Sequence, residues 1–71
     1  MIVSRLHKVM ADRKISVNEL ADSIGINPVN LSRIRTGNNK GIRLSTLDNI
    51  CRELRCQPGD IFVFLNDDGF N

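Results

Sequence analysis

The chain has few of the residue types from which active sites and metal centres are built. Tryptophan and tyrosine are absent from its 71 residues, and histidine occurs once. A metal site would need more ligands than His7 and the two cysteines, Cys51 and Cys56. No carboxylate pair, nucleophile–base pair or glycine-rich phosphate loop has a spacing suited to catalysis or nucleotide binding. The sequence therefore predicts that the protein is not an enzyme and has no metal, cofactor or small-molecule ligand, with both cysteines as buried thiols.

Long hydrophobic runs and targeting signals are also missing. The longest apolar run, residues 61–65, is far shorter than the roughly 20 residues of a membrane-spanning helix. No segment has the pattern of a signal peptide. We therefore expect one small domain, residues 1–71, that acts in the cytoplasm without membrane association.

Acidic residues are absent between positions 23 and 47, although the chain as a whole contains eight. The same stretch contributes four positive charges, whereas the rest of the chain has six basic and eight acidic residues. Such a concentrated positive charge is typical of a DNA-facing surface, and the alternative is a solvated basic face without a ligand. The four basic residues are Arg33, Arg35, Lys40 and Arg43.

The most informative segment is residues 16–37, which predicts two short helices joined by a tight turn. Ser16 and Glu19 have the spacing of a capping box, and Gly25 is suited to end the helix that they begin. Asn27 and Pro28 then provide a capping side chain and a proline for the first turn of a second helix. Helices this short are unstable alone, so the pattern favours a helix-turn-helix packed on other helices.

Three further helices surround this segment. We expect the first over residues 4–13 and a loop over residues 37–43. Ser45 is predicted to cap a fourth helix, and Pro58 to begin a fifth. The buried face of the fourth helix is predicted to contain Leu47, Ile50, Cys51 and Leu54.

From position 5 to about 65, the chain resembles the DNA-binding domain of the phage Cro and cI repressors and of the wider Xre-type bacterial regulators. The resemblance implies an all-α, compact five-helix, lambda-repressor-like DNA-binding domain whose second and third helices form the helix-turn-helix. It also implies a bacterial cytoplasmic protein that associates with the nucleoid when it binds DNA. The residues that carry it are Leu20, Ala21, Gly25, Ile26, Leu31, Ile34 and Gly37.

A recognition helix in the major groove contacts bases through its first turn and the following turn. These positions are Pro28, Val29, Asn30 and Arg33. Arg33 is the strongest candidate because its planar guanidinium can form two hydrogen bonds with guanine O6 and N7. Asn30 suits adenine or a phosphate, whereas Val29 suits a thymine methyl or packing against the preceding helix. Many relatives have glutamine or serine where this chain has Pro28 and Val29, so a known operator sequence cannot be transferred.

Phosphate and minor-groove contacts are expected from polar and basic residues around this helix. Those in the loop follow from the resemblance, and their alternative is a flexible loop with solvated side chains. Arg35 is predicted to reach the edge of the DNA backbone or solvent. The candidates are Ser16, Asn18, Asn27, Thr36, Asn38, Asn39, Lys40 and Arg43.

The C-terminal segment, residues 61–71, holds all three aromatic residues, Phe62, Phe64 and Phe70. A single helix face cannot bury four consecutive apolar residues at 62–65. These phenylalanines are therefore candidates for a dimer surface. The alternatives are ordinary closure of the core and a segment that is partly extended.

Together these features predict a sequence-specific, double-stranded-DNA-binding transcriptional regulator. We expect a repressor that binds a palindromic site as a homodimer. The alternative is an antitoxin-like or co-regulatory module that binds a protein partner, with DNA binding secondary.

Overall fold

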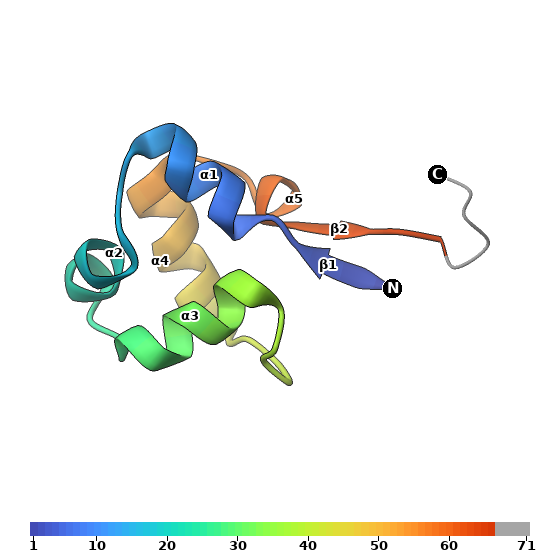
Figure 1. Cartoon of the computed structure of the whole chain (residues 1–71), viewed down its shortest axis with the longest axis horizontal. Helices are drawn as coiled ribbons and strands as arrows, with labels where there is room; N and C mark the ends of the chain where they lie inside the picture. Colours follow the sequence, from blue (N-terminus) through green and yellow to red (C-terminus); the bar gives the residue numbers. More distant parts are fainter. Residues whose placement is uncertain (67–71) are drawn as a thin grey trace.

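The computed structural model describes residues 1–66, which form five helices and two short strands. The five-helix fold with its helix-turn-helix is confirmed, and a small sheet is added to it. In chain order the elements are β1 (Ile2–Ser4), α1 (Leu6–Arg13), α2 (Val17–Ile24), α3 (Pro28–Thr36), α4 (Leu44–Leu54), α5 (Pro58–Ile61) and β2 (Phe62–Phe64) (Figure 1).

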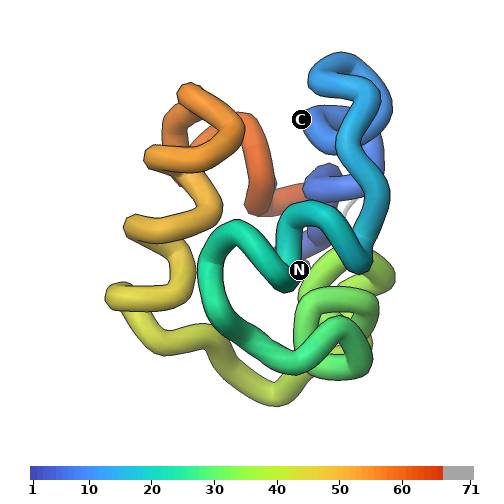
Figure 2. The backbone as a smooth tube through the Cα atoms, turned by 90° about the vertical axis from the view of Figure 1, so that its left-hand side faces the viewer, coloured from blue at the N-terminus to red at the C-terminus, as the bar shows by residue number. Residues whose placement is uncertain are grey.

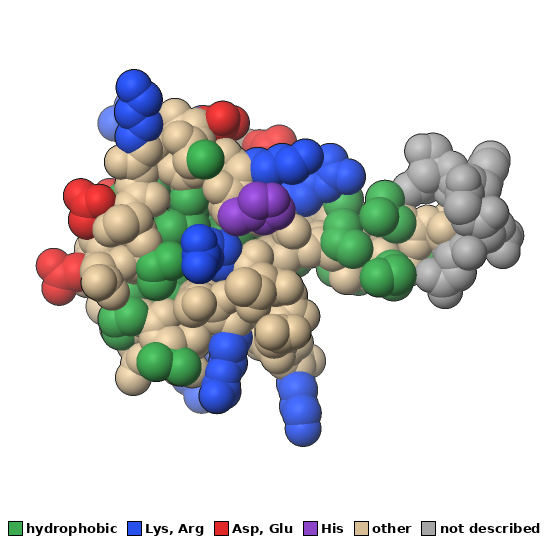
Figure 3. All heavy atoms as spheres, viewed as in Figure 1, with side chains coloured by type: hydrophobic (Ala, Val, Ile, Leu, Met, Phe, Trp, Pro, Cys, Tyr) green, Lys and Arg blue, Asp and Glu red, His purple; other side chains and the backbone are tan. Residues whose placement is uncertain are grey.

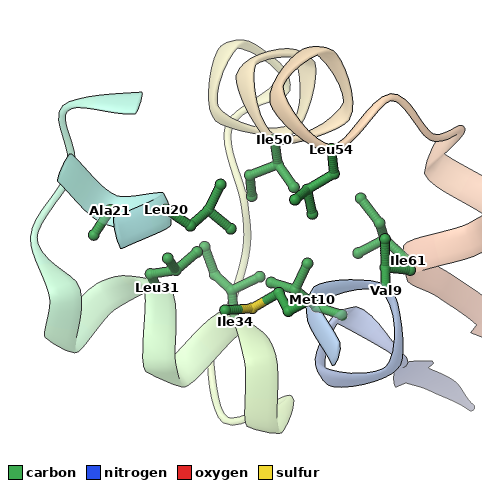
Figure 4. Close-up of a cluster of buried hydrophobic side chains, with 10 residues drawn as sticks. Val9, Met10, Leu20, Ala21, Leu31, Ile34, Ile50, Leu54 and Ile61 are labelled. Carbon is green, nitrogen blue, oxygen red and sulfur yellow. The ribbon is translucent and has the colours of Figure 1, made fainter. Parts of the chain in front are cut away.

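One hydrophobic core joins all five helices. Leu20 of α2, Leu31 of α3 and Ile50 of α4 have no exposed surface, and their side chains converge between the helices (Figure 4). In Figure 2, α1 and α4 lie on opposite sides of the bundle. Because helices of eight or nine residues are marginal in water, burial in this core is what stabilises α2 and α3.

Local capping also follows the sequence prediction around α2. The Ser16 hydroxyl accepts a hydrogen bond from the Glu19 backbone N–H at 3.1 Å, and Glu19 Oε1 accepts one from the Ser16 N–H at 3.0 Å. Gly25 ends α2 with φ of 74°, a conformation that favours glycine. These contacts fix the position at which the chain turns into α3.

An arginine side chain links the C-terminal ends of α1 and α4, two helices that are far apart in the sequence. Arg13, the last residue of α1, donates from Nε to the Leu54 carbonyl at 2.8 Å and from a terminal nitrogen to the Arg55 carbonyl at 3.3 Å. Both acceptors lie at the C-terminus of α4, where helix carbonyls lack partners within the helix. The guanidinium thus caps α4 from α1.

Residues near the two ends of the described chain pair as an antiparallel ribbon, β1 with β2. The register places Ile2 opposite Phe64, Val3 opposite Val63 and Ser4 opposite Phe62. The predicted start of the first helix at residue 4 is therefore wrong: residues 2–4 are extended, and α1 begins at Leu6. Of the alternatives for the apolar tail, the extended one is observed over Phe62–Phe64.

The prediction that Ser45 caps the fourth helix is also wrong. Arg43 occupies the N-cap, with an extended backbone and a carbonyl that accepts from the Leu47 N–H at 3.0 Å. Ser45 therefore lies within the first turn of α4, and no side chain caps that helix. Across the described part of the chain, no helix combines the length and apolar character needed to cross a membrane.

Candidate nucleic-acid interface

The exposed face of α3 is held in place by a capped start and a buried underside. Asn27 Oδ1 accepts a hydrogen bond from the Val29 N–H at 2.7 Å, and Pro28 stands at the first helical position. Leu31 and Ile34 anchor the helix in the core, with 0% and 6% of their surface exposed. The helix therefore presents one polar face outward. The exposed candidates on it are Pro28, Val29, Asn30, Arg33 and Thr36.

The sequence leaves two roles open for Val29, contact with a thymine methyl and packing against the preceding helix, and its exposure argues against the second. Its side chain is 58% exposed, so it does not pack under α2. Ala21 of α2 is 1% exposed and lies in the core between α2 and its neighbours. A small residue at this position allows α2 and a neighbouring helix to approach closely.

The loop after α3 encloses a surface cavity together with that helix. The cavity has a volume of about 720 Å³. In the loop, the Asn39 side-chain nitrogen donates to the Gly41 carbonyl at 3.0 Å. Six of the predicted DNA-contact residues therefore meet at one place, from two separate stretches of sequence. They are Asn30, Arg33, Asn38, Asn39, Lys40 and Arg43.

All charged residues that line this cavity are basic. Arg33, Lys40 and Arg43 line it with exposed side chains, and no acidic residue is among its lining residues. Figure 3 shows basic side chains projecting from the edge of the molecule formed by α3 and this loop. A surface of this kind attracts a polyanion such as a nucleic-acid backbone.

Arg35 differs from the prediction, because it is only partly exposed. Its Nε atom is buried and has no hydrogen-bond partner among the described residues. The residue follows the buried Ile34 on the helix, so part of its stem packs beside the core while the rest of the side chain stays exposed. It does not line the cavity with Arg33.

The predicted phosphate contacts at the start of α2 are in a different environment. Ser16 uses both its hydroxyl and its backbone N–H in the capping box with Glu19. Hydrogen bonding to Ser16 lowers the pKa of the Glu19 carboxyl, so a negative charge sits where a phosphate was expected. Asn18 is exposed nearby and lines a shallow hollow with Pro28 and Glu19. This geometry disfavours Ser16 as a phosphate ligand and leaves Asn18 available.

Five of the residues that line the cavity were not predicted as DNA contacts: Ile26, Ile34, Gly41, Ile42 and Thr46. Ile42 and Thr46 line it from the loop and from the first turn of α4. Thr46 lies three residues after the N-cap Arg43, so a correct start for α4 would have placed it on the same side. Because the sequence prediction placed the N-cap at Ser45, it did not place Thr46 on this side of α4.

The remaining predicted groups lie elsewhere. Phe62 packs against the core, Phe64 is 63% exposed on the ribbon, and Phe70 lies outside the described residues. His7 is exposed on α1.

Cys51 and Cys56 are free thiols and only partly buried, not fully buried as predicted. Burial, with Cys51 adjacent, raises the pKa of the Cys56 thiol to about 11. Among residues 1–66, no group of three potential metal-binding side chains is found.

Comparisons with known proteins agree with this geometry. The family model of the Cro/C1-type HTH DNA-binding domain matches residues 5–67. YozG of Bacillus subtilis (strain 168), described as an uncharacterized HTH-type transcriptional regulator, is 46% identical over 67 residues, which cover 94% of this chain and 80% of YozG. The crystal structure of the transcriptional regulator VanUg superposes with a TM-score of 0.74 at 27% identity, covering 93% of this chain and 87% of that one.

Proposed function

The chain belongs to the Cro/C1-type helix-turn-helix DNA-binding domain family, and we propose that it is a sequence-specific transcriptional repressor that binds palindromic duplex DNA as a homodimer. The family is one of DNA-binding regulators, not of enzymes. The observation that carries the proposal is the cavity in which Arg33 of α3 and Lys40 of the following loop meet without any acidic neighbour. Residues 1–71 act as one DNA-binding unit, in the bacterial cytoplasm on nucleoid DNA.

Base recognition is assigned to the exposed face of α3 in the major groove. Arg33 donates two hydrogen bonds to guanine O6 and N7, the pairing for which its planar guanidinium is suited. Asn30 lies one turn earlier on the same face and pairs with adenine. Val29, exposed and apolar, contacts a thymine methyl, and Pro28 fixes the start of the helix against the DNA.

Phosphate contacts position this helix without reading sequence. Lys40 and Arg43 contribute positive charge from the loop, and Asn38 and Asn39 contribute neutral donors or acceptors. Thr36 is the weakest of the candidates because its hydroxyl already donates to the Ser32 carbonyl at 3.1 Å. Asn18 and Asn27 flank the opposite end of α3 and complete the row of contacts along the strand.

Two copies on one operator explain how so small a surface achieves specificity. A single module contacts only a few base pairs, whereas two copies on half-sites one helical turn apart double the base contacts. An identical pair requires a palindromic site. Occupied promoter DNA is closed to other proteins, so binding alone is sufficient for repression.

The experiment that tests this function is selection of bound sequences from a random duplex library at physiological salt. We expect enrichment of a motif with two inverted half-sites, followed by reduced reporter expression when that motif overlaps a promoter. Enrichment of a single unrepeated half-site would contradict the palindrome. No enrichment at all would contradict sequence-specific recognition, and raised reporter expression would contradict repression.

A further inference from the structure

A second cavity lies between the ribbon of β1 and β2 and the loop that follows α3. It has a volume of about 380 Å³, which is within the roughly 300–1,000 Å³ that is typical of small-molecule sites. In Figure 1 this loop begins at the end of α3 nearest the ribbon. Three separate stretches of sequence form the walls. The lining residues are Ile2, Ser4, Gly37, Asn39, Lys40, Gly41, Ile42 and Phe62.

Apolar side chains from both strands and from the loop contribute to these walls. Ile2 of β1 is 64% exposed, whereas Phe62 and Ile42 are partly buried and pack against the core. Ile2 pairs with Phe64, two residues from Phe62, so Ile2 and Phe62 lie on the same face of the ribbon. An apolar molecule placed here would remove part of the Ile2 surface from water, which is favourable.

The polar groups of this cavity include a single charge. Among the described residues that line it, only Lys40 has a charged side chain, and that side chain is exposed. The neighbouring Asn39 is partly buried, and its side-chain nitrogen donates to the Gly41 carbonyl at 3.0 Å. The Ser4 hydroxyl accepts from the Leu6 N–H at 3.4 Å and has its own O–H as a donor. An ammonium and a hydroxyl beside an apolar surface suit a carboxylate that is joined to an apolar body.

We infer that this cavity, the ribbon–loop cavity, binds a small apolar carboxylate, with the carboxylate at Lys40 and the apolar body between Ile2 and Phe62. An uncharged molecule of the same shape would gain the apolar contacts without the attraction to the ammonium, and a cation would be repelled. The sequence predicts no small-molecule ligand because it contains no ligand-binding motif. A cavity assembled from residues about sixty positions apart has no such motif.

Lys40 connects the ribbon–loop cavity with the surface assigned to DNA. Residues 39–42 line both this cavity and the basic cavity beside α3. A carboxylate at Lys40 would occupy the ammonium that the proposed function assigns to a phosphate, and it would add a negative charge beside the DNA backbone. The two ligands should therefore weaken each other's binding. This consequence rests on the proposed function, whereas binding of the carboxylate does not.

The test is a titration of the full chain with phenylacetate, followed through the isoleucine and leucine methyl signals in NMR spectra. Phenylacetamide has nearly the same shape without the charge, and acetate has the charge without the ring. Phenylacetate should shift the signals of Ile2 and Ile42 with a Kd of about 1 mM, as expected for a ligand of about ten non-hydrogen atoms. Phenylacetamide and acetate should bind at least about threefold more weakly. The signals of Leu44 and Leu47, which line a different hollow on α4, should not move.

Variants separate the charged part of the cavity from its apolar part. Lys40→Gln should make phenylacetate bind no better than phenylacetamide, because glutamine has no charge. Ile2→Thr, which retains a residue that favours strands, should weaken both aromatic probes to the same extent. The matched controls are Lys8→Gln and Leu44→Thr, at exposed residues outside the ribbon–loop cavity, and both should leave the affinities unchanged. Circular dichroism establishes that each variant is folded.

Three results with the unaltered chain would overturn the inference, and none of them depends on a variant. They are equal affinities for phenylacetate and phenylacetamide, shifts at Leu44 and Leu47 in place of Ile2 and Ile42, and no shift at millimolar phenylacetate.

Binding to DNA separates failure of this inference from failure of the proposed function. Operator affinity is measured by fluorescence anisotropy in sodium phenylacetate and in sodium chloride of equal concentration, so that ionic strength is constant. Saturating phenylacetate should weaken operator binding about fivefold in the unaltered chain and have no effect in Lys40→Gln. Unchanged operator affinity in the unaltered chain would overturn the connection between the two cavities. Loss of sequence preference in chloride alone would instead refute the proposed function, while the methyl shifts would still report binding of phenylacetate.

Discussion

The surface around α3 and the ribbon of β1 and β2 lie on either side of one loop but differ in charge. The first is lined by basic residues, and the strands of the second have no charged side chain. Around α3, the side chains of Asn30 and Arg33 stand beside Lys40 and Arg43, with no carboxylate among the lining residues. On the ribbon, Ile2 and Phe64 are also exposed, yet no charged side chain occurs in either strand.

This difference shows that one small domain keeps a basic surface and an uncharged apolar surface apart. A basic surface attracts a polyanion, whereas an uncharged apolar ribbon gives it no electrostatic attraction. The loop at residues 37–43 divides them, and a common core supports both. Variants can therefore affect both regions, only one of them, or one kind of contact within a region.

The largest effect should come from Leu31→Ala, which removes the support that both regions share. Leu31 is fully buried in the core beneath α3, so its truncation leaves a cavity and should lower the free energy of unfolding by about 2–5 kcal/mol. Urea denaturation followed by circular dichroism measures this loss. Leu44→Ala, at an exposed site, is the control and should change stability by less than about 0.5 kcal/mol. Equal losses in the two variants would argue against a common core.

Arg33→Ala should affect the α3 surface and leave the ribbon unchanged. Loss of its two hydrogen bonds to guanine should weaken binding to the selected operator by about 1–3 kcal/mol and relax the preference at one base pair. Fluorescence anisotropy with the operator and its single-base variants measures both effects. Arg52→Ala is the control, because Arg52 is exposed on α4 and paired with Asp48 at 2.7 Å, away from the cavity. Equal weakening on random DNA and on the operator would show that Arg33 contacts only the backbone.

Ser16→Ala tests whether capping of α2 supports the adjacent recognition helix. Loss of the cap should lower the free energy of unfolding by about 1 kcal/mol, with Ser23→Ala on the same helix as the control. Because the folded state lowers the pKa of Glu19, the contribution of this box is present above its ordinary value of 4.5 and lost as the pH falls below it. The difference in stability between the two proteins should therefore shrink in acid without disappearing, because the Ser16 hydroxyl still accepts from the Glu19 backbone N–H when the carboxyl is protonated. A constant difference at every pH would mean that the carboxylate takes no part.

The same two regions differ in how far the sequence predicts them. The helix-turn-helix is encoded by signals only a few residues apart, such as Ser16 with Glu19 and Asn27 with Pro28, and these were read correctly. The ribbon depends on pairing between residues about sixty positions apart, for which neither strand carries a local signal. Its three-residue strands are too short for alternation to be recognised.

The residues of the candidate site also differ in how far the sequence predicts their positions. Exposure of Arg33 and Asn30 followed from helical spacing, and the family resemblance named the loop residues as DNA contacts, but only the structure shows that the two sets line one cavity. The partial burial of Arg35 was not predicted, because a helical wheel gives direction but not the depth to which a long stem packs. The contribution of Thr46 was missed because serine is a common helix cap, whereas in this fold Arg43 holds that position without a side-chain bond.

Lys40→Ala should have the smallest effect and should divide the α3 surface into its two kinds of contact. A lysine that neutralises one phosphate contributes equally to all sequences, so its loss should weaken operator and random DNA alike. The slope of log affinity against log salt should then become shallower by about one unit, because about one fewer counterion is released. Lys8→Ala, an exposed lysine of α1 outside the cavity, should leave the slope unchanged. If the slope stayed constant while preference at one base pair changed, Lys40 would belong with Arg33 among the residues that read sequence.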